Sequence, residues 1–129
     1  MSLGSSINAI LEADVNVVAA ATGGIFPLRA RQGAVAPYLV YRIEDTMPHD
    51  DKDGVSSVDH FFVVIEAYAK TYLAVDTLSD LVRTALDRTS GTYDTIVVNS
   101  IQFQNKEDLF VDDAGVHLQE QDFKVRINN

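Results

Sequence analysis

The segment from His60 to Leu86 constrains the fold more than any other part of the chain. Over residues 60–70, side chains of one parity are all apolar, the two-residue period of a strand with one apolar face. After Thr71, which can cap a helix, the apolar positions follow the 3.6-residue period of an amphipathic helix through residue 86. A helix that follows a strand directly can fold back over the sheet, so we expect this unit to form the centre of an α+β domain.

The other face of the predicted strand is apolar in part. Phe62, Val64 and Tyr68 share it with polar residues. If the helix covers one face of the sheet, this second face needs cover from a neighbouring subunit or another layer. We therefore expect Phe62, Val64 and Tyr68 to lie at an interface.

Two helices and two extended segments are predicted before this strand. Ser5 or Ser6 can cap a helix over residues 7–12, and Asp14 can cap a second helix over residues 15–21. The extended segments are expected at residues 25–29 and 38–43.

Residues 45–58 are expected to form an exposed, mobile loop. Pro48, Gly54 and two serines lie there among acidic residues. Loops of this length inside a compact domain are uncommon unless they have a role, so the loop is a candidate contact surface. A solvated loop without a partner is the alternative. The interface residues predicted in this segment are Asp50, Asp51, Asp53 and Gly54.

A long antiparallel hairpin is predicted after the helix, with strands from Ile96 and over residues 117–127. Between them, residues 112–115 are a strong turn signal, since glycine suits the left-handed position. The apolar parity of the second strand changes, which predicts a bulge or a change of partner at residues 119–122. The chain is thus expected to be one α+β domain over residues 1–129. Its mostly antiparallel sheet carries a long C-terminal hairpin and is packed by an N-terminal helical region and one central amphipathic helix.

Composition narrows the function classes. A chain of 129 residues with 47% hydrophobic and 22% charged residues fits one soluble domain, and it has no apolar run long enough for a membrane span. It has no cysteine and its first residues lack the basic start of a secretory signal, so we expect folding in a cytoplasm. The net charge of −9 disfavours nucleic-acid binding and is most simply a solubility feature.

No pattern in the chain indicates chemistry. His49, His60 and His117 are scattered, and there is no nucleophile elbow, P-loop or dinucleotide fingerprint. Residues 49–60 come closest to a calcium loop, but histidine occupies the first and twelfth positions, where carboxylates are required. We expect a protein that is not an enzyme and has no catalytic, cofactor or metal site.

The order of segments resembles the tail completion, or tail terminator, proteins that join head to tail in long-tailed bacteriophages and prophages. The resemblance covers nearly the whole chain. It lies in the order of a helical start, a short extended piece, a proline-led strand, an acidic loop, the strand–helix unit and the closing hairpin. The corresponding sequences are INAILEADVNVVA, IFPLRA, PYLVY, VDTLSDLVRTALD and DLFVDDAGVHLQEQDFKV.

This resemblance implies a virion structural protein that assembles in the host cytoplasm as a ring, usually of six copies. The ring would sit at the head-proximal end of the tail tube, stop tube growth and contact the tube protein and the head–tail connector, while DNA passes through the lumen without specific binding. The loop at residues 45–58 and the turn residues Asp112, Asp113 and Gly115 would then face the tube, the neck or the lumen.

Two other readings remain open from the sequence. One is a neck or connector protein without terminator activity. The other, from a different class, is a small cytoplasmic α+β enzyme or ligand-binding domain.

Overall fold

The computed structural model describes residues 3–51, 54–93 and 95–128. Over residues 45–51 and 54–59, and at residue 128, it describes the backbone alone. The first half of the chain forms α1 (Leu3–Ala13), α2 (Val15–Ala20), β1 (Ile25–Pro27), β2 (Tyr38–Asp51) and β3 (Gly54–Ala69). The second half forms α3 (Tyr72–Leu86), β4 (Gly91–Tyr93), β5 (Ile96–Val111) and β6 (Val116–Asn128). The fold is α+β, as predicted.

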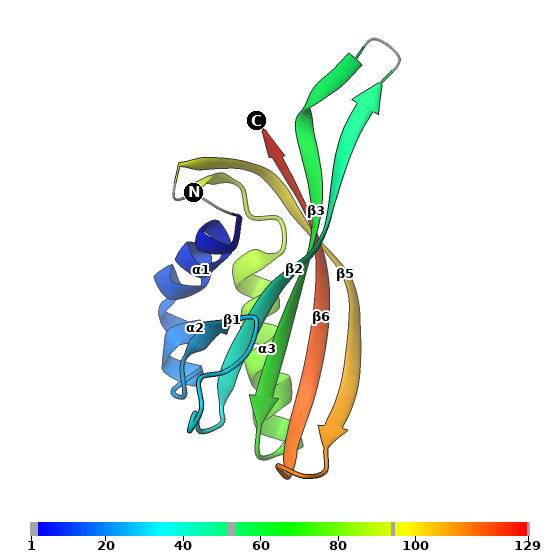
Figure 1. The fold of residues 1–129 in the computed structure, drawn as a ribbon. Coiled ribbons are helices and arrows are strands. Elements are labelled where there is room, and N and C mark those ends of the chain that lie inside the picture. Colours follow the sequence, from blue (N-terminus) through cyan, green and yellow to red (C-terminus); the bar gives the residue numbers. More distant parts are fainter. Residues whose placement is uncertain (1–2, 52–53, 94, 129) are drawn as a thin grey trace.

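The strands form a single sheet that is mostly antiparallel. Its order is β1-β2-β3-β6-β5-β4, and β1 is parallel to β2 while every other pair is antiparallel. The three helices lie together on one side of this sheet (Figure 1). The core fills the space between the two layers, and none of the described residues forms a helix on the other face of the sheet.

The strand–helix unit forms as the sequence predicts. Val63, Ile65, Ala67 and Ala69 are at most 1% exposed and point to the helices. Thr71 caps α3, since its Oγ1 accepts a hydrogen bond from the Ala74 nitrogen at 3.1 Å. The apolar stripe of α3 then covers β3 and β6 with Val75, Leu78, Val82 and Leu86.

The N-terminal helices differ from the prediction at one cap. Asp14 does cap α2, accepting hydrogen bonds from the nitrogens of Asn16 and Val17 at 3.0 and 3.1 Å. Ser6, however, lies inside α1, is fully buried and donates a hydrogen bond from its Oγ to the Tyr93 backbone oxygen at 2.8 Å. A buried hydroxyl that satisfies a distant carbonyl ties α1 to β4 and starts no helix.

The prediction of a loop at residues 45–58 was wrong. β2 and β3 continue through this segment as an antiparallel ladder, with register shifts between Ile43 and Asp45 and between Pro48 and Asp50. The residues of β3 that precede Val58 do not pair with β6, and this end of the β2–β3 hairpin projects from the body of the molecule (Figure 1). We call residues 45–58 the arm. Its bulges accommodate proline at a strand edge, which is why a composition typical of loops forms strands here.

The β5–β6 hairpin is confirmed, and one of its two register shifts lies opposite Asp122 and Phe123, at the end of the predicted stretch, but with the extra residue on β5. Gly115 takes the left-handed conformation with φ 63°, and its nitrogen donates to the Val111 oxygen at 2.9 Å. β6 itself pairs with β3 without interruption from residue 117 to 128. The register shifts lie on β5, between Val98 and Ser100 and between Phe103 and Asn105.

Two buried glutamines explain the change of parity on β6. Gln119 and Gln121 occupy positions that face α3, at 1% and 2% exposure. The Gln121 side chain donates to the Ser79 backbone oxygen at 2.9 Å, and the Gln119 side chain donates to Asp76 Oδ1 at 3.2 Å. Polar residues thus continue the helix-facing side of β6, and no bulge is needed.

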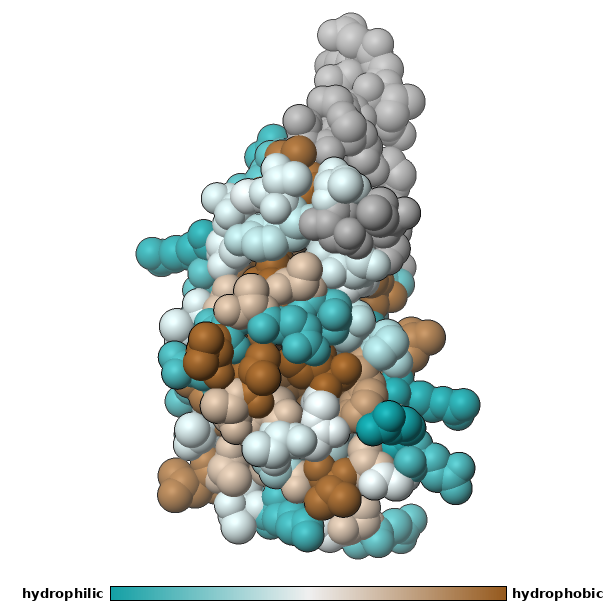
Figure 2. Space-filling model, turned by 90° about the vertical axis from the view of Figure 1, so that its left-hand side faces the viewer, coloured by the Kyte–Doolittle hydropathy of each residue, from teal (hydrophilic) through white to brown (hydrophobic). Residues whose placement is uncertain are grey.

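The surface over the helices carries separate hydrophobic patches among hydrophilic ones, not one continuous apolar face (Figure 2). The large apolar residues exposed on α2 and on the segment from β1 to β2 are Val15, Val18, Leu28 and Val35. No helix within the described ranges is long and apolar enough to cross a membrane.

Candidate interaction surfaces

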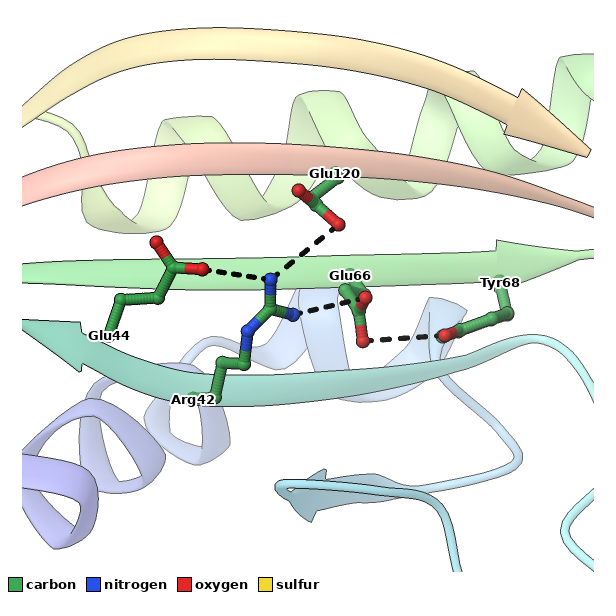
Figure 3. Close-up of polar contacts among 5 residues, drawn as sticks. All are labelled: Arg42, Glu44, Glu66, Tyr68 and Glu120. Carbon is green, nitrogen blue, oxygen red and sulfur yellow. Dashed lines mark hydrogen bonds and ion pairs between the residues drawn. The ribbon is translucent and has the colours of Figure 1, made fainter.

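The helix-free face of the sheet carries a charge cluster centred on Arg42. Its guanidinium pairs with Glu44 and Glu66 at 3.1 Å each and lies 3.8 Å from a carboxylate oxygen of Glu120 (Figure 3). The Tyr68 hydroxyl donates to the other oxygen of Glu66 at 3.3 Å. These residues come from β2, β3 and β6, so the antiparallel register brings them together.

Two further acidic residues extend this cluster across the sheet. Asp122 is opposite Val64 on β6, and Glu107 is opposite Glu120 on β5. Neighbours on one face of a sheet interact, so Arg42 lies among five carboxylates, while Lys124 and Arg126 of β6 lie farther along the same face. We call Arg42, Glu44, Glu66, Glu107, Glu120 and Asp122 the acidic face.

Burial is the main cause of the pKa shifts on the acidic face, and neighbouring carboxylates add to it. Partial burial raises the pKa of Glu120, with Arg42 opposing and Glu66 adding to the effect. Burial and the charge of Glu44 likewise raise the pKa of Asp122. Burial, together with Glu66, raises the pKa of Tyr68 to about 12.

Neutralising Glu120 is therefore expected to stabilise the fold slightly. Because the pKa of Glu120 is raised on folding, its charged form is disfavoured in the folded state, and this cost appears as the pH rises through its pKa. Glu120→Gln should raise the free energy of unfolding at pH 7 by less than about 1 kcal/mol, the scale of partly exposed charge interactions. Urea unfolding at pH 7 and at pH 3 measures this, and the gain should vanish at the lower pH, where the carboxyl is protonated. Asp80→Asn, on the exposed side of α3, is the matched control; a loss of stability from Glu120→Gln at pH 7 would contradict the expectation.

The predicted interface residues of β3 do not behave alike. Val64 lies on the helix-free face but is only 1% exposed within one chain, so it can offer almost no area to a partner. Phe62 and Tyr68 are partly exposed, and the Tyr68 ring stacks on Tyr38 with centroids 4.8 Å apart. The role of all three residues in an interface stays a prediction, and Phe62 and Tyr68 have the more exposed side chains.

The arm contains the interface residues that were predicted within the acidic segment 45–58. Asp50 and Asp51 belong to its β2 strand, opposite Val55 and Gly54 on β3. Asp53 lies outside the described residues. The arm brings this acidic sequence to the end of a projection, away from the acidic face (Figure 1).

The turn between β5 and β6 lies at the opposite end of the molecule from the arm (Figure 1). Asp112, Asp113 and Gly115 are exposed there. Beside it, a groove of about 280 Å³ runs between the start of α3 and the hairpin, and its lining residues include Tyr72, Asp108, Phe110 and His117. The structure thus separates the two predicted contact regions along the length of the strands.

No direct signal in the sequence indicated the cluster of Arg42 and its partners. The only trace was the regular occurrence of polar residues on the second face of each strand. Among the residues that the structure describes, no three His, Asp or Glu side chains are arranged to hold a metal ion. In the calcium-like pattern of residues 49–60, the side chains before His60 lie outside the described set.

Comparison with known proteins supplies a family. The family model described as "Tail completion protein gp17" matches residues 5–128. A solved chain from the structure entitled "Virion of native gene transfer agent (GTA) particle" is similar, with a TM-score of 0.79 over 99% of this chain and 96% of that chain. At 19% identity this likeness concerns the fold. No curated protein sequence matches.

Proposed function

Since the chain belongs to the family of tail completion protein gp17, we propose that it forms a ring at the head-proximal end of a phage tail tube, where it stops tube growth and joins the tail to the head. Membership makes it a structural protein of the phage tail and not an enzyme. The proposal adds a ring, usually of six copies, and contacts with the tube protein and the head–tail connector.

The one-sided architecture carries this proposal. All three described helices cover one side of the sheet (Figure 1). The residues of the acidic face lie on the opposite side. A wall built from such subunits can turn its helices outward and its acidic face inward. DNA phosphates are repelled by an unneutralised acidic surface, so DNA can pass such a wall without adhering.

The two ends of the molecule suit contacts along the axis of a tail. The arm projects at one end and the β5–β6 turn lies at the other. In the proposed ring, one end meets the tube and the other meets the neck. We therefore assign Asp50, Asp51 and Asp53 of the arm, and Asp112, Asp113 and Gly115 of the turn, to contacts with different partner proteins.

The test is to add the purified chain to a lysate that lacks it while tails assemble there. We expect electron microscopy to show tails of uniform length with a ring at one end, and heads joined after connector-bearing heads are added. The heat-unfolded chain is the control. Tails whose lengths and ends are unchanged by the folded chain would refute the proposal, and joining of heads without an effect on tail length would refute the termination step.

A further inference from the structure

The sheet has two long outer edges that are only partly covered. β1 pairs with β2 over Leu39–Tyr41, which leaves the outer edge of β2 open from residue 42 to 51. β4 pairs with β5 over Ile96–Val98. Among the residues described, no strand covers the rest of either edge. Open edges of this kind are templates for pairing with another chain.

The edge of β5 is further closed by the segment after α3. The Arg88 nitrogen donates to the Ile101 oxygen at 2.7 Å, and the Phe103 nitrogen donates to Asp87 Oδ1 at 3.0 Å. The open part of this edge is therefore residues 104–111. The two open stretches are of similar length, eight residues on β5 and ten on β2.

The covered stretches lie at complementary ends. Consider an antiparallel pairing of residues 104–111 of one copy with residues 42–51 of a second copy. The covered part of β5 in the first copy, residues 96–103, then lies beyond the tip of the second copy's arm. The covered part of β2 lies beyond the β5–β6 turn. Neither β1 nor β4 then stands between the two edges.

The backbone phase of the two edges also agrees. The contacts of Ile101 and Phe103 show that residues on β5 with outward backbone groups carry helix-facing side chains. On β2 the same holds, since Leu39 and Tyr41 use outward groups to bind Gly24 and Leu28 and both belong to the core. Facing residues of an antiparallel pair share one side of the sheet. The helices of both copies would then lie on the same side.

We propose that the open edge of β5 in one copy pairs with the arm edge of β2 in the next, so that the sheet continues from subunit to subunit. This inference rests on the proposed ring and assigns its subunit contact. Alternation beyond the bulges turns the backbone groups of Asp108 on β5 and Thr46 on β2 outward, and these two residues lie near the centres of their stretches. The offset between neighbours along the strands requires the strands to be inclined to the ring axis, as in any closed barrel.

A disulfide ladder tests the pairing. The chain has no cysteine, so a double variant, Thr46→Cys with Asp108→Cys, carries one thiol on each edge. Two strands separate these positions within one chain, so they are about 14 Å or more apart there and cannot be linked. Oxidation of rings on tails should give a ladder of covalent oligomers on a non-reducing gel. Each single variant should remain monomeric; a dimer from Asp108→Cys alone would mean that β5 pairs with itself and would overturn the inference.

A proline substitution supplies the second measurement. Asp108→Pro removes an outward N–H without touching the pairing with β6, while Asp108→Ala removes the same carboxylate and keeps the N–H. We expect at least tenfold less ring on tails for the proline variant than for the alanine variant, with cooperative thermal unfolding for both. Equal ring formation by the two variants would overturn the inference.

The outcomes separate this inference from the proposed function. Rings on tails without a ladder from the double cysteine variant would refute the edge pairing alone. A ladder from a chain that neither ends nor joins tails would refute the proposed function alone. Absence of both rings and ladder would refute both.

Discussion

Deletion of residues 49–56 is expected to leave the body of the protein folded and to abolish the joining of tails to heads. Within this range, residues 49–51 and 54–56 belong to the outer part of the arm, where β2 and β3 pair only with each other. An isolated two-stranded hairpin is marginally stable at best, so its loss should cost the fold little. The contacts that we propose between the arm and other proteins would be lost entirely.

The deletion is checked by two measurements on one preparation. Thermal unfolding should remain cooperative with a midpoint close to that of the full chain. When the deleted chain is added to the lysate that lacks the protein, electron microscopy should show no tails joined to heads. Asp50→Asn with Asp51→Asn keeps the arm and removes two of its charges, so this variant separates the shape of the arm from its charge. Normal particle assembly with the deleted chain would show that the arm is not needed for joining tails to heads.

Phe123→Ala is expected to have the largest effect on stability. Phe123 lies at the centre of β6, is fully buried and contacts Phe103 edge to face with centroids 5.8 Å apart. Truncation of a buried phenylalanine costs about 3–5 kcal/mol, a large part of the 5–15 kcal/mol that holds a typical domain together. Urea unfolding should show the loss as a lower midpoint.

Phe110→Ala is the matched control for this substitution. Phe110 lies on the neighbouring strand and is 51% exposed. Its truncation should change the free energy of unfolding by less than about 1 kcal/mol, as surface substitutions usually do. Equal losses from Phe123→Ala and Phe110→Ala would mean that the core is not centred on β6.

The sequence predicted those elements whose signals are local. The periods of residues 60–86, the caps at Asp14 and Thr71 and the turn at Gly115 each depend on neighbours in the chain, and all are confirmed. The arm was missed because Pro48 and Gly54 are typical of loops, and only the register with the opposite strand reveals that they lie at strand edges and bulges.

The acidic face could not be predicted for a related reason. Arg42 meets Glu66 and Glu120 only because three strands distant in sequence align, and a register change of one residue would turn each side chain to the other face. The bulges on β2 and β5 set that alignment. Similarly, the burial of Val64 depends on side chains from adjacent strands, which no period within β3 encodes.

The place of β6 in the sheet has a consequence for synthesis. β6 follows every other strand in this chain, yet it lies between β3 and β5 and contributes Phe123, Val125 and Ile127 to the core. While the chain is still on the ribosome and β6 has not emerged, the β2–β3 and β4–β5 pairs have no common strand to join them. The core closes only after β6 has left the exit tunnel. A chain that ends before β6 would therefore lack both the strand that joins the two pairs and three residues of the core.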